Sequence, residues 1–296
     1  MVTTRVATNV AELVRRHSDL PEAATVHLQR LVATWGTLSD LCFADLLLFV
    51  PMARGVASRP EGFVVVGQVR PTTNATLHLE DLVGRVRSEA ERPLVARSWR
   101  LGSVVDGEVA IPSRNEAGRV VCIPVRFKGE LVAILTRESA LSVGRRPGQL
   151  ERVYMEVFDR LARMVSSGEY PYPMDEVVTT ETPRVGDGVF VLDASMRVDY
   201  ASPNAVNAFH RMGISSGLAG VRLDEVGFDA SAVAHAYDQA LPTTEEVTNG
   251  PEVAVVIRCM PLLDHRSVTG AIVLMRDVSE LRRRDRLLLS KDAAIR

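Results

Sequence analysis

The stretch Gly270–Arg296, GAIVLMRDVSELRRRDRLLLSKDAAIR, decides how the end of this chain folds. Its opening, Gly270–Met275, is typical of a buried strand, and the remainder predicts a helix without any internal glycine or proline. Asp277 is expected to cap this helix, and Glu280, three residues later, can reach back to the cap amide. The strand is therefore expected to pass directly into the helix.

Apolar residues recur along this stretch at a spacing of seven. Such a spacing puts one apolar stripe on a helix and favours a left-handed coiled coil between two chains. A helix packed on its own domain explains the spacing equally well, because fewer than three heptads are present. Asp285 and Asp292 fall where a second apolar row is expected, so the seam is weak enough for its pairing to switch. The stripe consists of Leu274, Leu281, Leu288 and Ile295.

Composition excludes several classes of protein. The 296 residues suffice for about two domains, and a net charge of -2 supplies no overall field for nucleic acid or a membrane surface. No apolar run approaches the roughly 20 residues of a membrane span, and no signal-peptide core precedes the first helix. The three dispersed cysteines have neither disulfide nor metal spacing. We therefore expect a cytoplasmic protein that contacts neither nucleic acid nor membrane.

The order of predicted elements divides the chain into α+β domains, each an antiparallel sheet flanked by helices. Residues 1–168 begin with helices, continue with strands and a hairpin at Lys128-Gly129, and end with a helix. Residues 169–184 contain three prolines and are expected to be a linker. Residues 185–277 hold two strands, small helices and three further strands. Residues 278–296 form the C-terminal coiled-coil helix.

Specific residues in the second domain carry a resemblance to PAS domains. The run Val191-Leu-Asp193 followed by Val198-Asp-Tyr-Ala-Ser-Pro-Asn-Ala205 resembles the opening of a PAS domain. The run Gly270–Ser279 is similar to its closing strand and the Asp-x-Ser junction after it. The first domain resembles a GAF domain, through its N-terminal helices, central antiparallel sheet and the hairpin at Gly129.

The whole chain is most similar to the GAF-PAS region of cytosolic actinobacterial two-component sensor histidine kinases of the PdtaS type. The phrases Tyr200–Ala205, His210–Gly213 and Arg284–Arg296 carry this similarity. The resemblance implies signal input to a dimeric kinase core beyond Arg296. It also implies ATP in that core and a response regulator as partner. No catalytic residue and no enzyme activity are expected within these 296 residues.

Two other functions remain open on the sequence alone. The same modules can regulate a different output enzyme, such as a cyclase or a phosphatase. A stand-alone dimeric adaptor that binds a ligand is the other alternative. Residues beyond Arg296 would distinguish the three, since a histidine-bearing helix there supports a kinase.

Both domains have sheets of a kind that can enclose a small ligand, and such a site needs a few polar groups in an apolar pocket. Asn204 has a competing role as a brace of the helix after Pro203. Haem is disfavoured, because a lone histidine such as His210 on a short helix is usually structural, and no metal or cofactor is expected. The candidate ligand-binding residues are Arg70, Asn74, His78, Arg100, Asn204, Asn207 and Arg258. The expected signal-junction and dimer-helix residues are Asp277, Glu280, Leu281, Leu288 and Ile295.

Overall fold

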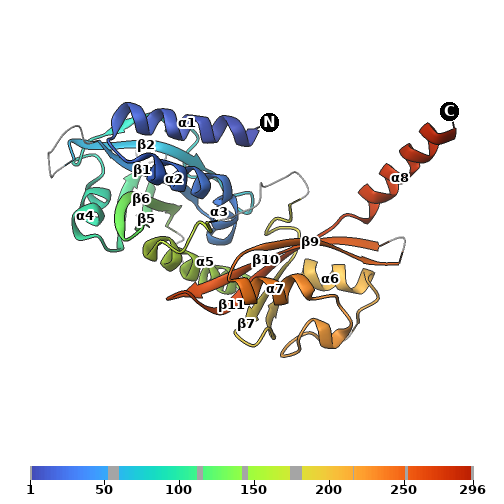
Figure 1. The fold of residues 1–296 in the computed structure, drawn as a ribbon. Helices are drawn as coiled ribbons and strands as arrows, with labels where there is room; N and C mark the ends of the chain where they lie inside the picture. The colour runs from blue at the N-terminus through green and yellow to red at the C-terminus, as the bar shows by residue number, and fades with distance from the viewer. Residues whose placement is uncertain are drawn as a thin grey trace. The chain divides into compact units, whose positions relative to one another are not determined.

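The chain forms two compact units, residues 1–173 (unit 1) and 174–296 (unit 2). The computed structural model describes residues 2–52, 60–111, 116–141, 146–173, 182–215, 217–250 and 253–294, with the backbone alone at 2–9, 111, 116 and 288–294. Each unit is an antiparallel sheet flanked by helices, as the sequence predicted (Figure 1).

The sheet of unit 1 has six strands in the order β3-β2-β1-β6-β5-β4. At its centre β1 pairs with β6, and β5 and β6 are joined by the predicted hairpin turn. Lys128 and Gly129 both adopt positive φ, 51° and 86°, which is the conformation that a two-residue hairpin turn requires. The strands are β1 (Asp45–Met52), β2 (Gly62–Val69), β3 (Val86–Arg87), β4 (Val105–Ile111), β5 (Glu116–Phe127) and β6 (Glu130–Ala140).

The helices of unit 1 cover both faces of this sheet. One face packs against α2 and α5, where Trp35 lies against Gly67 and Phe158 lies beneath Arg137. On the other face α4 contributes Val95 and Ala96 to an apolar cluster with Leu47 and other strand residues. The helices are α1 (Val2–His17), α2 (Glu22–Thr34), α3 (Gly36–Cys42), α4 (Pro93–Leu101) and α5 (Gln149–Ser167).

The chain begins with helices, as the sequence predicts. Three helices precede β1, because the chain turns at Trp35 and α3 begins separately at Gly36. Pro21 stands just before α2, at the N-cap. Phe43 then ends α3 in the left-handed conformation, with φ of 52°.

The end of unit 1 extends further than the predicted domain boundary. Residues 169–173, which were expected to belong to the linker, lie in unit 1. Tyr170 and Tyr172 are fully buried, and their rings meet edge to face at 5.4 Å. The Tyr170 hydroxyl donates a hydrogen bond of 2.9 Å to Oγ1 of Thr34. These aromatic contacts hold the chain on unit 1 after α5 has ended.

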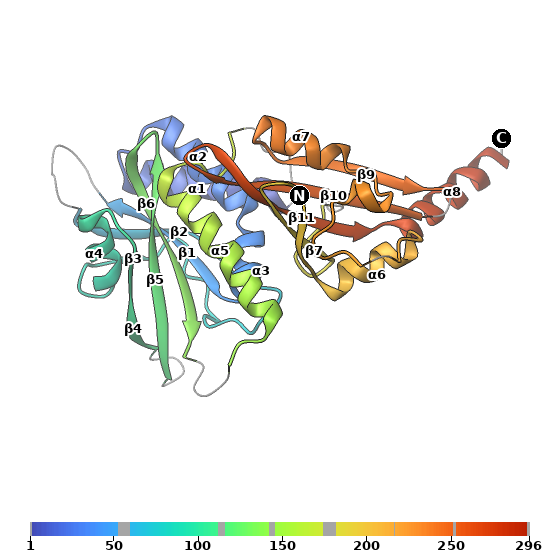
Figure 2. The ribbon, with the colours of Figure 1, turned by 90° about the horizontal axis from the view of Figure 1, so that it is seen from below.

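Unit 2 contains a five-stranded sheet in the order β8-β7-β11-β10-β9, and Figure 2 shows it from below. Helices α6 and α7 cover one face of the sheet and enclose the apolar core between them. Its strands are β7 (Val189–Asp193), β8 (Val198–Ala201), β9 (Thr243–Asn249), β10 (Val253–Asp264) and β11 (Ser267–Asp277). Its helices are α6 (Pro203–Arg211), a short 3₁₀ helix η1 (Asp224–Val226), α7 (Ser231–Gln239) and α8 (Ser279–Ala294).

The final strand and helix follow one another as expected, with β11 ending at Asp277 and α8 beginning at Ser279. Leu274 lies within β11 and is fully buried, so it cannot belong to a helical stripe. The apolar stripe predicted for the helix therefore does not begin at Leu274. In β11 this residue lies opposite Arg258 of β10 and Val189 of β7. Within the described residues, no helix combines the length and the low polarity needed to cross a bilayer.

Candidate functional site

The most polar part of the interior of unit 1 is a cluster at one end of the central strand pair. Asp45 on β1 stands directly opposite Glu138 on β6, and Leu47 stands opposite Thr136. Successive strand residues alternate between faces, so these four side chains share one face of the sheet. Asp45 and Glu138 are only 1% and 2% exposed. Two carboxylates that are this deeply buried require partners.

The protein supplies partners to all four carboxylate oxygens. Asp45 accepts from the Thr76 hydroxyl at 2.9 Å and from the amides of Leu77 and His78. Glu138 meets Nε2 of His78 at 2.7 Å. It also accepts from the Arg92 guanidinium at 2.8 Å and from the Thr136 hydroxyl at 2.9 Å. The backbone and ring of His78 therefore connect the two carboxylates.

The charge state of Glu138 follows from these contacts. Burial by itself would raise the pKa of the Glu138 carboxyl, but the His78 hydrogen bond and the Arg92 charge outweigh burial and lower it below 4.5. The Arg92 guanidinium also lies 5.3 Å above the Phe49 ring, where a cation is attracted. Because its oxygens are already occupied by protein donors, this cluster acts structurally: it fastens residues 76–78 and the start of α4 to the sheet.

The four candidate ligand residues of unit 1 do not converge on one pocket. Arg70 donates to the carbonyls of His78 and Glu80, and Asn74 donates to the carbonyl of Phe43. Arg100 is exposed and pairs with Glu89 at 2.9 Å. His78 alone joins the buried cluster. The structure thus gives Arg70 and Asn74 a role in shaping the segment after β2, and ligand binding by all four stays a prediction.

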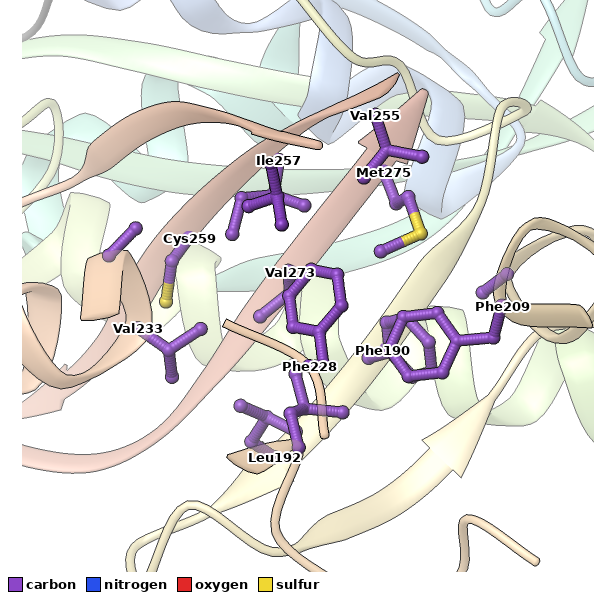
Figure 3. Packing of buried hydrophobic residues seen from close by; sticks show 14 of the residues in the cluster. Phe190, Leu192, Phe209, Phe228, Val233, Val255, Ile257, Cys259, Val273 and Met275 are labelled. Carbon is purple, nitrogen blue, oxygen red and sulfur yellow. The ribbon is translucent and has the colours of Figure 1, made fainter. Parts of the chain in front are cut away.

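The interior of unit 2 is filled by apolar side chains, three phenylalanines among them, rather than by polar groups (Figure 3). The Phe209 ring lies 4.8 Å from Phe190 and 4.9 Å from Phe228, centroid to centroid. Ile257 and Cys259 of β10 point toward the same apolar cluster. This side of the sheet is therefore packed with apolar groups.

The three candidate ligand residues of unit 2 lie apart from that interior. Asn204 is exposed and donates to the Gly186 carbonyl at 2.8 Å, and Asn207 is exposed on α6. Arg258 is 4% exposed, but it alternates with Ile257 and Cys259 and so occupies the opposite face of the sheet, where it donates to Thr244. Their role in ligand binding stays a prediction.

One cavity of about 290 Å³ lies at the surface of unit 2, beside η1 and the start of α7. Its apolar lining comes from Met196, Leu223, Phe228 and Val233, and its polar rim includes an Arg222–Asp224 ion pair of 3.0 Å. This volume is at the lower end of the range for small-molecule sites. None of the predicted residues lines it.

The junction between β11 and α8 is built around Asp277. One oxygen of its carboxylate accepts from the Ser279 amide at 2.9 Å, and the other pairs with Nε of Arg211 on α6 at 2.6 Å. Burial by itself would raise the pKa of Asp277. The hydrogen bonds from Ser279 and the charge of Arg211 together lower it by more than burial raises it, so the net shift is downward. Asp277 thereby joins α6 to the first turn of α8.

The helix after Asp277 begins one residue later than predicted. The Val278 carbonyl accepts from the Arg282 amide at 2.9 Å, which makes Val278 the residue that precedes the helix. Glu280 is then at the second helical position, with an exposed side chain, and not at the third. Leu281 is half-buried; the Leu288 side chain and all of Ile295 lie outside the described part of the chain.

The cysteines of the described residues are not placed for nucleophilic chemistry. Cys42, Cys122 and Cys259 are buried free thiols, and burial raises the pKa of each to about 12, which makes them poor nucleophiles at neutral pH. Across those residues, no group of three or more His, Cys, Asp or Glu side chains is arranged to hold a metal ion.

Comparison with known proteins agrees with this architecture. Residues 10–158, just over half of the chain, match the family described as "Histidine kinase PdtaS, GAF domain". The chain belongs to the PdtaS histidine kinase family. Residues 183–283 of this PdtaS-family chain match a PAS fold.

Curated relatives extend the match to nearly the whole chain. Sensor histidine kinase PdtaS of Mycolicibacterium smegmatis is 37% identical, and that of Mycobacterium tuberculosis is 38% identical, each over 97% of this chain. The chain spans 59% of the length of these relatives. A solved structure of the sensor region of a sensor histidine kinase is 34% identical, with a TM-score of 0.76 over 93% of this chain and 99% of that one. These 296 residues therefore correspond to the GAF and PAS sensor region of the PdtaS family.

Sequence reasoning about this PdtaS-family chain missed most of the buried cluster. It singled out His78 but not Asp45, Arg92 or Glu138. A signal was present, because Asp45 and Glu138 interrupt apolar strand patterns on the side that faces inward. A charged residue at such a position has to find a partner, and the sequence does not say which one.

Proposed function

We propose that this sensor region controls a dimeric, ATP-dependent histidine kinase that phosphorylates itself and then transfers the phosphoryl group to a response regulator. The relatives, which are sensor histidine kinases, favour this output over a cyclase, a phosphatase or a stand-alone adaptor. Kinase chemistry would be supplied by a core that these 296 residues do not include. The residues described here supply the input and the helix that carries it.

The observation that carries this proposal is the Asp277 junction. Two contacts of one carboxylate connect α6, on the core side of the unit 2 sheet, to α8. A displacement of α6 or β11 would therefore change how α8 leaves the sheet. This makes Asp277 the proposed transmitter, with Glu280 beside it at the start of the helix.

We further propose that α8 pairs with its counterpart in a parallel homodimer through Leu281, Leu288 and Ile295. Burying each of these side chains is worth about 1.5–3 kcal/mol. Allosteric coupling energies are commonly about 1–3 kcal/mol, so repacking one layer is sufficient to transmit a signal. A small-molecule ligand of the GAF or PAS unit remains the proposed input.

The test uses the whole kinase and labelled ATP. Asp277→Ala is expected to change the rate of autophosphorylation while leaving the fold of unit 2 intact, because Asp277 is partly exposed and lies at the edge of the core. Asp264→Ala, which removes an exposed carboxylate of the same unit away from the cavity beside η1, is the control. An unchanged rate in Asp277→Ala would refute the transmitting role. Labelling of residues 1–296 alone would contradict the assignment of catalysis to a separate core.

A further inference from the structure

Beyond Asp277, a second set of contacts holds α8 to the sheet of unit 2. Glu246 on β9 and Arg282 on α8 form a two-pronged ion pair, in which Nη2 and Nε of Arg282 donate to the carboxylate at 2.6, 3.0 and 3.2 Å. Each side chain is about one-third exposed. A guanidinium bound by two of its nitrogens is fixed in direction as well as in distance.

Apolar and backbone contacts support this pair from below. Val278 is 2% exposed and packs in a small cluster with Ala254 and Val256 of β10. The Val278 amide donates to the Ala254 carbonyl at 2.9 Å, and the Ala254 amide donates to the Ser279 hydroxyl at 3.0 Å. The first turn of α8 is therefore attached to two neighbouring strands, β9 through charge and β10 through packing and hydrogen bonds.

These contacts lie on one side of the helix. With about 3.6 residues per turn, Val278 and Arg282 fall on the same side of α8. By the same helical geometry, Leu281 and Leu288 point about 100° or more around the helix axis from Arg282. The face that holds the sheet and the predicted dimer stripe are thus adjacent, so the orientation of the first fixes that of the second.

We infer that Glu246 and Arg282 are positioning residues that set the rotation of α8 about its own axis, and so decide which residues face a second copy of the chain. This inference rests on the proposed dimer and states how the α8–α8 interface of that dimer would be regulated. A change that separates β9 from α8 would leave α8 free to rotate about its own axis. The apolar stripe of one chain would then no longer face that of the second chain in one fixed orientation.

Hydrogen exchange of the peptide covering residues 275–283 tests the pair. Glu246→Arg and Arg282→Glu should each speed exchange by roughly three- to tenfold, since each replaces attraction by repulsion. The double variant with both charges exchanged should return to within about twofold of the parent chain. Arg284→Glu, the same charge change on an exposed position of α8, is the control. Single variants that match this control, or a double variant as fast as the singles, would overturn the inference.

Cysteine cross-linking tests the rotation. The three native thiols are at most 1% exposed, so they do not compete. Leu288→Cys should form an intermolecular disulfide faster than Leu287→Cys, and adding Glu246→Arg should reduce that preference at least roughly threefold. An undiminished preference would overturn the inference. A chain that remains monomeric in native mass spectrometry refutes the proposed dimer instead, and the exchange experiment then still decides the ion pair.

Discussion

Substitution of Glu138 should strongly lower the free energy of unfolding of unit 1. It is 2% exposed and shares its oxygens among His78, Arg92 and Thr136. Glu138→Gln preserves the shape but leaves the Arg92 charge without compensation. We expect a loss of about 2–4 kcal/mol in the free energy of unfolding of unit 1.

Tryptophan fluorescence measures this loss in unit 1 alone, because the chain has two tryptophans and both, Trp35 and Trp99, lie there. Asp106→Asn is the matched control. It breaks an Asp106–Arg119 pair whose side chains are more than half exposed, and should cost less than about 1 kcal/mol. Equal effects in the two variants would show that burial of the cluster contributes little.

His27 makes unit 1 sensitive to acid. Its ring is 4.9 Å from that of Phe127, and its Nε2 is buried with no hydrogen-bond partner among the described residues. Burial, and next the charge of Arg30, lower the pKa of His27 from 6.5 to about 4. Between pH 6.5 and 4, His27 is protonated in the unfolded chain but stays neutral in the folded chain. The free energy of unfolding therefore falls as the pH falls.

The corresponding test compares denaturation of the parent chain and His27→Leu at several pH values. The parent should lose about 2–3 kcal/mol from His27 between pH 6.5 and 4, and the loss from this group should level off by about pH 3. His27→Leu should lack that component. His265→Leu, an exposed change in unit 2, should behave as the parent in tryptophan fluorescence. A pH profile of His27→Leu that overlays the parent's would rule out this source of acid sensitivity.

At the scale of elements, the start of α6 depends on one hydroxyl. The Ser202 side chain caps α6 by accepting from the Ala205 amide at 3.3 Å, and it also accepts from the buried Val189 amide at 2.9 Å. The cap was readable from the sequence Ser-Pro-Asn. The bond to Val189 was not, because it joins the helix to another strand.

Ser202→Ala removes both bonds and should destabilise α6 and β7 by about 1–2 kcal/mol. Hydrogen exchange of the peptides covering residues 189–212 should then be roughly tenfold faster, which is the fold-change that 1.4 kcal/mol produces. Asn204→Ala changes an exposed amide two residues away and should alter exchange by less than about threefold. Exchange in Ser202→Ala that stays at the level of Asn204→Ala would show that the Val189 bond adds nothing.

Prediction of elements succeeded where local pattern and local chemistry agreed. The hairpin at Lys128-Gly129 and the strand-to-helix order at Asp277 are both confirmed. Leu274 lies in the predicted strand, as Gly270–Met275 indicated, and not in the helical stripe, because a spacing of seven does not by itself distinguish a strand residue from a heptad position. Helix α8 begins one residue later than predicted, because Val278 packs against β10 and stays outside the helix.

For the whole molecule, the expected state is a dimer through α8. Leu281→Asp combined with Leu288→Asp places charges on the predicted stripe and should weaken dimerisation at least about tenfold, given about 1.5–3 kcal/mol for each buried leucine. Native mass spectrometry over a dilution series measures the dimer fraction, and also detects any retained ligand. Arg284→Asp is the control for added charge. A dimer that survives the double change must be formed elsewhere in the chain.

The sequence by itself determined the succession of helices and strands, the division into a GAF-like and a PAS-like domain, and the resemblance to PdtaS-type kinases. These follow from periodicity, caps and turns, which are properties of neighbouring residues. Only the tertiary structure decided which side chains meet. Asp45, His78, Arg92 and Glu138 come from four separate segments, and Arg258 lies outside the core because strand pairing sets its face. Such contacts depend on register and packing between distant segments, and these are not encoded in any short stretch.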